Sequence, residues 1–279
     1  MGTNFSEDIN VSLFIKLSIA LTGTALFWGA TATATKAASI VFVSPSSGGV
    51  GIVNESTAKF TQVASGPTFT DIAVSNEGQL FGITFNQLFN INLSSGTSSF
   101  IGNLGSTLNG LGFSQENVLY GTGGSDFYKI DTLTGATQLI SNISGFNSSG
   151  DIVFNPNTRR FLASSIGDSL WSIDPNSGSA NKIGNINFSS VVGLFFERGN
   201  LYGYTVNGQE ISINQQTGAG TFNRNVTGLP GQVWGSGSLP SGESIPSQPV
   251  PEPTSILGSI LGLSAFKWAQ KRRYLQQKG

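Results

Sequence analysis

Between residues 39 and 238, apolar and polar residues alternate in short runs that are separated by Gly, Asn and Ser. Four such runs lie at 71–74, 110–113, 151–154 and 191–194. Alternation places apolar side chains on one face of an extended strand and the intervening side chains on the other. The pattern therefore predicts an all-β domain over residues 39–238.

The strands belong to an internal repeat of about forty residues, a period typical of stacked supersecondary units. Each copy contains Ile, then Asn or Asp, two variable residues, Ser or Thr, and Gly. The copies begin at Ile91, Ile130, Ile173 and Ile213, with a degenerate copy at Val53. We expect the Asn or Asp side chain to cap a turn and the Gly to supply positive φ. Strand-like runs on both sides of this turn make each unit a four-stranded meander.

A single sheet of this kind cannot bury both of its faces, so the units must stack, and radial stacking of four-stranded sheets produces a β-propeller. Complete units fill residues 69–228, whereas three further runs at 40–43, 50–53 and 59–63 lack an inner strand. The run at 232–235 supplies that strand. We therefore predict five blades, one of them closed by strands from both ends of the domain, which leaves no open sheet edge. A six-bladed ring is the alternative.

The repeat resembles the Tyr-x-Ile-Asp-x-x-Thr-Gly units of many exported bacterial propellers, and residues 130–135 show the pattern well. The resemblance implies the propeller fold. It implies no particular activity, because the pattern is shared by too many proteins.

The composition removes several classes of chemistry. The chain has no His and no Cys, which excludes a Ser-His-Asp triad, a Cys nucleophile, a Cys/His zinc site and a disulfide. Its 14 Lys and Arg balance 15 Asp and Glu without a basic patch in the domain, which argues against nucleic-acid binding. Charged residues make up only 10% of the chain, so hydroxyl and amide groups must hydrate the surface, as in many exported β-rich proteins. We expect no metal ion and no cofactor.

Residues 1–38 are predicted to be a secretory signal peptide that forms a helix. Lys16 precedes an apolar stretch at 17–28, and small residues follow at 30–34. Signal peptidase requires small side chains at its cleavage site, which this segment provides. The stretch is short for a membrane span, which needs about 20 apolar residues. An N-terminal anchor or a buried helix is the alternative.

The C-terminal region has three parts. Residues 239–249 form a linker rich in Gly, Ser and Pro, which cannot bury enough apolar surface to fold. The segment 250–279 opens with a short Pro-rich motif and continues with an apolar stretch at 254–265, for which we predict a membrane helix. A basic tail follows, and such a tail holds the end of the helix in the cytoplasm. The motif is Val250, Pro251, Glu252 and Pro253, and the tail contains Lys267, Lys271, Arg272 and Arg273.

This order of motif, apolar stretch and basic tail resembles the PEP-CTERM sorting signal. In that family, the tripeptide matched by Pro251, Glu252 and Pro253 is recognised by an exosortase, a membrane-embedded transpeptidase-like cysteine protease. The resemblance implies a Gram-negative envelope, a precursor held in the inner membrane, and a link with exopolysaccharide. An ordinary C-terminal tail anchor is the alternative. The resemblance is confined to residues 250–279 and implies nothing about what the exported domain does.

Asp71 and Asp151 occupy equivalent positions at the start of their predicted inner strands, near the axial channel. Two carboxylates across a channel suit a glycosidase, with one as the acid and the other as the base or nucleophile. The other units carry Gly110, Val191 and Gln232 at this position. An Asp that opens an inner strand also commonly caps the preceding loop. We favour this structural role and keep catalysis as the alternative.

Three further features have simple explanations. The sequence around Asp174 resembles a calcium loop but lacks the later Glu, so we expect a turn. Trp171 and Trp234 are candidates for stacking on sugars, but their strand positions favour packing between blades. Arg159 and Arg160 follow a turn sequence, and we expect them in solvent.

The leading hypothesis is a non-enzymatic exported protein of the cell envelope, outer surface or extracellular matrix. Signal peptidase and an exosortase would process it, and one face of its propeller would bind extracellular polysaccharide or a surface protein. The alternative is an extracellular glycan-processing hydrolase or lyase that uses the channel carboxylates, assisted by Asp126 or Asp168. A propeller that holds a quinone cofactor finds no support, because the chain lacks its Trp-docking repeats and metal ligands.

Overall fold

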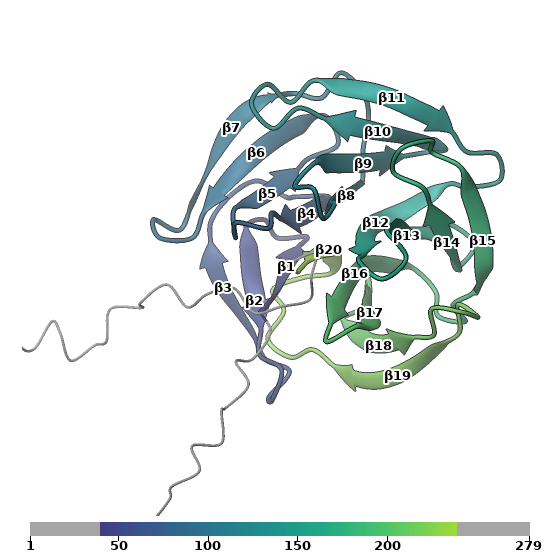
Figure 1. Ribbon diagram of the computed structural model, residues 1–279. Helices are drawn as coiled ribbons and strands as arrows, with labels where there is room; N and C mark the ends of the chain where they lie inside the picture. Colours follow the sequence, from purple (N-terminus) through teal and green to yellow (C-terminus); the bar gives the residue numbers. More distant parts are fainter. Residues whose placement is uncertain (1–39, 239–279) are drawn as a thin grey trace, which may run out of the picture. The chain divides into compact units, whose positions relative to one another are not determined.

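Twenty β-strands form in residues 40–238, the part of the chain that the computed structural model describes. They are arranged as five antiparallel four-stranded sheets around a central axis (Figure 1). The predicted five-bladed β-propeller is thereby confirmed, and the six-bladed alternative is wrong. The predicted helices in 1–38 and 250–279 lie outside the described residues. Within the described part of the chain, no helix has the length and apolar character needed to cross a membrane.

Four blades are built from consecutive strands, which follow one another from the axis outward. Blade 1 contains β4 (Asp71–Val74), β5 (Leu80–Ile83), β6 (Gln87–Asn92) and β7 (Thr97–Asn103). Blade 2 contains β8 (Gly110–Phe113), β9 (Leu119–Gly123), β10 (Asp126–Ile130) and β11 (Thr137–Asn142). Blade 3 contains β12 (Ser148–Asn155), β13 (Arg160–Ser165), β14 (Ser169–Ile173) and β15 (Ala180–Asn185). Blade 4 contains β16 (Val191–Glu197), β17 (Asn200–Thr205), β18 (Gln209–Ile213) and β19 (Gly220–Asn225).

Blade 5 combines the two ends of the described chain. Its inner strand is β20 (Val233–Gly237), and β1 (Val41–Pro45), β2 (Val50–Val53) and β3 (Phe60–Ala64) follow outward. β20 and β1 pair in antiparallel register, with Phe42 opposite Gly237. The predicted closure of one blade by both ends is confirmed, so hydrogen bonds rather than a covalent link complete the ring (Figure 1).

The hydrophobic core is divided into five clusters, each between two neighbouring blades. Alternate residues of β1 show how this arises. Val41 and Val43 pack towards Phe195 of blade 4, whereas Phe42 packs towards Ile72 of blade 1. The alternating strands therefore bury both faces of a sheet, one against each neighbour. Burying a side chain of this size contributes about 1.5–3 kcal/mol, so the blades are stable as a ring rather than singly.

The repeat turn has the capping hydrogen bonds predicted from the sequence. In blade 2, Asp131 Oδ1 accepts the backbone N–H groups of Leu133 and Thr134 at 2.8 and 2.9 Å. The equivalent Asn or Asp makes two such bonds in each of the other blades. The turn glycine has positive φ in blades 1 to 4, and in blade 5 its place is taken by Ala58 with φ of 53°.

The same turn also contacts the outer strand of the preceding blade. Gly135, with φ of 77°, lies against Gly102 of blade 1, and a Cβ atom on Gly102 would lie 1.8 Å from the carbonyl oxygen of Thr134. Blades 3 and 4 meet in the same way through Gly184 and Gly218. The repeat glycine therefore serves both the turn and the close approach of neighbouring blades.

Substitutions at two equivalent turn positions should change stability in opposite directions. In Gly135→Ala, the side chain adds left-handed backbone strain of about 1–2 kcal/mol and a contact with Gly102, so the free energy of unfolding should fall by at least that amount. In Ala58→Gly, relief of the same strain is offset by about 0.5–1 kcal/mol of backbone entropy, leaving a net gain between zero and about 1.5 kcal/mol. Urea unfolding measures both changes. A loss of stability in both variants would contradict this account of the turn.

Candidate functional site

Asp71 and Asp151 lie at the centre of the ring, where the inner strands meet. Asp71 is 0% exposed and Asp151 is 1% exposed. Asp71 Oδ2 accepts the backbone N–H of Leu111, at 2.6 Å, and Asp151 Oδ2 accepts that of Leu194. Each carboxyl therefore connects its own inner strand to the inner strand of the following blade.

The two carboxyls also interact with each other and with blade 5. The charge of Asp151 acts on Asp71, and the Ser236 hydroxyl donates to Asp151 Oδ2 at 3.2 Å. Asp71 packs so closely against Gly235 that a Cβ atom there would lie 2.3 Å from its Oδ1. Burial raises the pKa of both carboxyls well above the ordinary value, and the charge of Asp151 raises that of Asp71 further. The pair therefore retains a proton at pH values where an exposed Asp is ionised.

The surroundings of this pair suit a structural role better than catalysis. A glycosidase pair must admit both a sugar and a water molecule. The void between the inner strands is only about 20 Å³, lined by residues such as Ile72, Phe113 and Leu194, and this volume is close to the minimum for one water molecule. A saccharide therefore has no path to the carboxyls in this arrangement.

The two assisting carboxylates considered for a hydrolase have other partners. Asp126 accepts hydrogen bonds from the Tyr128 hydroxyl at 2.9 Å and from Asn142 Nδ2 at 2.7 Å. Asp168 lies in a turn of blade 3 and accepts the backbone N–H of Ser190 at 3.0 Å. The structure therefore brings Asp71 and Asp151 together but leaves these two carboxylates with local structural contacts.

The turn at Asp174 contains no preformed calcium site. Asp174 Oδ1 accepts the backbone N–H groups of Asn176 and Ser177, and Oδ2 lies 3.3 Å from Nη1 of Arg160. Arg160 also donates to the hydroxyl of Ser172, at 2.7 Å, so the expectation that it lies free in solvent is wrong. The guanidinium group of Arg160 instead hydrogen-bonds to a neighbouring strand and to the following turn of blade 3. Among the described residues, no three Asp or Glu side chains gather as a metal-binding group.

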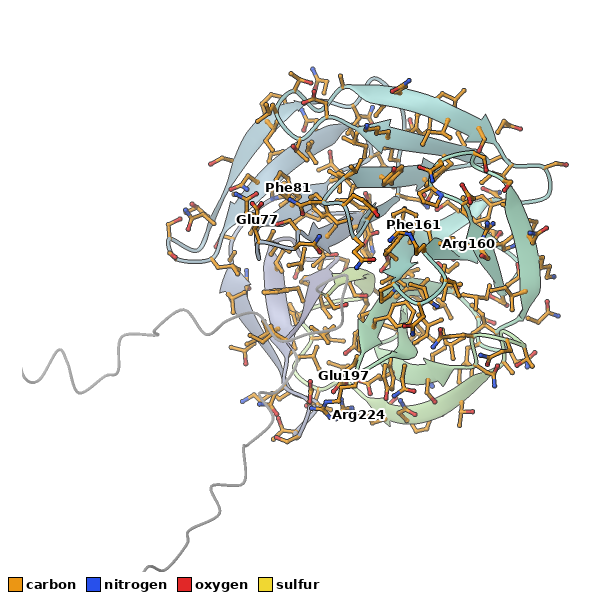
Figure 2. All side chains as sticks on the ribbon, viewed as in Figure 1. Glu77, Phe81, Arg160, Phe161, Glu197 and Arg224 are labelled. Atoms are coloured by element: carbon orange, nitrogen blue, oxygen red, sulfur yellow. The ribbon has the colours of Figure 1, made fainter. Side chains whose placement is uncertain are left out.

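A charged network connects blade 4 to blade 5. Arg224 donates from Nε and Nη2 to the Glu210 carboxylate at 3.0 and 2.9 Å, and from Nη1 to the carbonyl oxygen of Glu55 in blade 5. The Tyr204 hydroxyl donates to the same carboxylate at 3.2 Å. Glu197 lies beside this group (Figure 2), and burial, followed by the charge of Glu55, raises its pKa. Because Glu210 and Tyr204 are buried, the network stabilises the junction of the two blades.

The two faces of the ring differ in charge. One face is formed by the loops that lead into the inner strands and by the turns between the second and third strands of each blade. Within residues 40–238, the only charged residue in these loops and turns is Asp168. The turns of the opposite face carry acids such as Glu77 and Glu116 and bases such as Arg159 and Arg198. We call the first surface the uncharged face.

A depression of about 170 Å³, which we call the axial mouth, opens at the axis on the uncharged face. All five blades contribute to it. Its lining consists of Thr70, Phe85, Asn109, Ser149, Gly150, Val192, Val206, Val233 and Trp234.

Two aromatic residues mark one side of the axial mouth. Phe85 is 48% exposed in a turn of blade 1, and its ring centroid lies 6.4 Å from that of Trp234 in blade 5. The prediction that tryptophans pack between blades is confirmed for Trp171, which is buried against Phe146. Trp234 is only partly buried and lines the mouth. Sequence reasoning did not identify Phe85, although an apolar aromatic residue in a tight polar turn is a usable signal.

A second and larger groove lies between blades 2 and 3 on the charged side, with a volume of about 610 Å³. Its acidic residues are already paired, Glu116 with Arg159 and Asp174 with Arg160. Its charges therefore largely neutralise one another. The axial mouth is the stronger candidate because its side chains converge from all five blades.

The strand arrangement defines the class of protein as a β-propeller, and comparisons with known proteins add only similarity of fold. No protein-family model matches the chain, and no curated protein matches its sequence. A structural genomics protein of unknown function from Bacteroides thetaiotaomicron has a TM-score of 0.52 and 16% identity, over 70% of this chain and 58% of that chain. A chain of the nidogen/laminin complex has a TM-score of 0.51 and 8% identity, over 72% of this chain and 98% of that chain. At these identities the similarity shows the fold alone.

The raised pKa values of Asp71 and Asp151 should make stability depend on pH. A carboxyl with a raised pKa in the folded state contributes stability below about pH 4 that is lost as the pH rises through the folded pKa. Relative to the wild type, Asp71→Asn should therefore gain stability across this range, by at most about 1.4 kcal/mol per pH unit. Urea unfolding at a series of pH values measures the difference.

Asp131→Asn is the matched control, because Asn occupies the same turn position in other blades. Backbone N–H groups of Leu133 and Thr134 lower the pKa of Asp131, so its contribution is present above the ordinary Asp pKa and is lost as the pH falls. As the pH rises, Asp131→Asn should therefore lose stability relative to the wild type, whereas Asp71→Asn should gain it. If the stability of both variants relative to the wild type changed in the same direction with pH, the interpretation that burial raises the pKa values of Asp71 and Asp151 would be contradicted.

Proposed function

We propose that this chain is an exported, non-enzymatic binding protein of the cell envelope or extracellular matrix, and that its uncharged face binds extracellular polysaccharide. The observation that carries the proposal is the axial mouth, an aromatic-lined depression on a face whose loops carry amide and hydroxyl groups in place of charges. Aromatic rings combined with uncharged polar groups suit ligands that have both apolar surface and hydroxyl groups. A protein partner is the second candidate for the same face.

The alternative of a glycan-processing hydrolase is less well supported. Its nucleophile and acid would be Asp71 and Asp151, which are buried and engaged with backbone N–H groups. A binding role requires no group in the axial mouth to exchange protons. The uncharged lining of the mouth agrees with that requirement.

Export and sorting are the second part of the proposal and rest on sequence. Residues 1–38 would direct secretion, and an exosortase would recognise Pro251, Glu252 and Pro253 in a precursor held by the inner membrane. These segments lie outside the described residues. The unusual surface supports export, because a face hydrated by amides and hydroxyls is common in exported β-rich proteins.

Binding and turnover can be separated with one variant. We expect the wild-type protein to bind extracellular polysaccharide from its source organism without releasing new reducing ends, and Asp71→Asn to bind with unchanged affinity. Co-sedimentation measures binding, and a reducing-end assay measures cleavage. Turnover by the wild type that Asp71→Asn abolishes would establish the hydrolase alternative. Absence of binding would refute the glycan proposal.

Processing is tested with Glu252→Ala in the source organism. We expect the wild-type mature chain to begin between residues 33 and 39 and to end near residue 250, whereas the variant retains its C-terminal segment and stays in the inner membrane. Intact mass and membrane fractionation measure both properties. An unchanged C-terminus and location in the two proteins would reduce this segment to a plain anchor, and the inferred link with exopolysaccharide would be lost.

A further inference from the structure

We infer that the axial mouth binds the end of a neutral glycan, taking in one terminal sugar ring rather than a stretch of the chain. This inference rests on the proposed function and specifies its ligand. Its starting point is size. The mouth has a volume of about 170 Å³, and an engineered cavity of about 150 Å³ in another protein holds one benzene molecule. The space therefore fits a single ring.

The shape of the ring of blades determines how a ligand enters. The lining residues come from all five blades, so the mouth is a depression centred on the axis. Beneath it, Asp71 and Asp151 connect the inner strands and leave a void of only about 20 Å³. A polysaccharide cannot pass through the axis. A terminal sugar ring can enter the depression while the rest of its chain extends into solvent.

The aromatic pair selects the surface of the ligand. Trp234 and Phe85 present tilted rings, with an angle of 54° between their planes, on one side of the mouth. The C–H face of a sugar ring stacks on such a surface, because it is apolar and contacts the electron-rich face of the aromatic ring. Val192 and Val206 provide further apolar wall.

The polar part of the lining favours hydroxyl groups. Asn109 Nδ2 donates to the carbonyl oxygen of Ser148 at 3.1 Å, and Asn109 Oδ1 accepts no hydrogen bond from any described residue. This oxygen is itself buried, so it is not an acceptor that a ligand in the mouth can reach in this arrangement. Thr70 and Ser149 place two hydroxyl groups in the lining. Each donates its proton to a backbone carbonyl, of Ile83 and Val191, so its oxygen is left to accept from a ligand hydroxyl.

The charges select against an acidic ring. No Lys or Arg lines the mouth, so a carboxylate or sulfate would lose water without gaining a cation. Asp71 and Asp151 follow directly on the lining residues Thr70 and Gly150, so carboxyl groups rather than cations lie next to the mouth. The ligand is therefore a neutral sugar.

A ladder of neutral oligosaccharides tests this inference on the full-length chain. The probes are gluco-, galacto- and manno-oligosaccharides of increasing length, with matched chains that end in a uronic acid. Titration calorimetry measures affinity. The ligand-induced change in tryptophan fluorescence is measured for the wild type and for Trp234→Phe, and the difference between them is the response of Trp234. We expect at least one neutral series to bind with an affinity that stops rising after the first two sugars. The chains that end in a uronic acid should bind at least tenfold more weakly.

The matched variants are Phe85→Ala and Phe100→Ala. Both residues lie in blade 1 with similar exposure, 48% and 54%, but Phe100 stands on the outer strand away from the mouth. Phe85→Ala should weaken binding at least tenfold and Phe100→Ala should leave it unchanged. Because Phe85 lies in an exposed turn, this variant should fold as the wild type does.

Two results would overturn the inference. The first is binding to the neutral series that strengthens steadily with chain length and is insensitive to Phe85→Ala, which would indicate a groove elsewhere. The second is absence of binding to every neutral series. Either result leaves the proposed function standing if the protein still binds polysaccharide from its source organism, so the two failures are distinguishable.

Discussion

Each blade of this propeller has two apolar faces, and the burial of both is the constraint on which the rest of the structure depends. A four-stranded sheet with Val41 and Val43 on one face and Phe42 on the other is stable only between two neighbours. Since every blade has the same requirement, the sheets must form a closed ring. Closure in turn requires the two ends of the domain to meet, which they do in the pairing of β20 with β1.

Neighbouring blades are joined by different contacts near the rim and at the axis. Near the rim, the repeat turns contact the preceding blade so closely that Gly102 has no room for a Cβ atom. At the axis, Asp71 and Asp151 accept backbone N–H groups from the next blades. Buried charges are costly, and these carboxyls accept backbone N–H groups and have raised pKa values that favour the neutral form, so their burial is consistent with a structural role.

The same closure creates the candidate site. The inner strands fill the axis, so along the axis only the start of each inner strand leaves room for a ligand. The carboxyls that make the best sequence candidates for catalysis are used to hold the strands together. The groups left for recognition are aromatic and uncharged, which is why binding is a better interpretation of this fold than hydrolysis.

The sequence by itself determined the class of fold, the number of blades, the closing strand and the capped turn at each repeat, because these follow from local alternation and a regular period. It also placed Asp71 and Asp151 near the axis. Only the tertiary structure decided that the two carboxyls are sealed from solvent, which raises their pKa values, and that Phe85 and Trp234 lie side by side at the mouth. Such contacts join residues far apart in the chain, and their geometry depends on how tightly the five blades close, which no local pattern encodes.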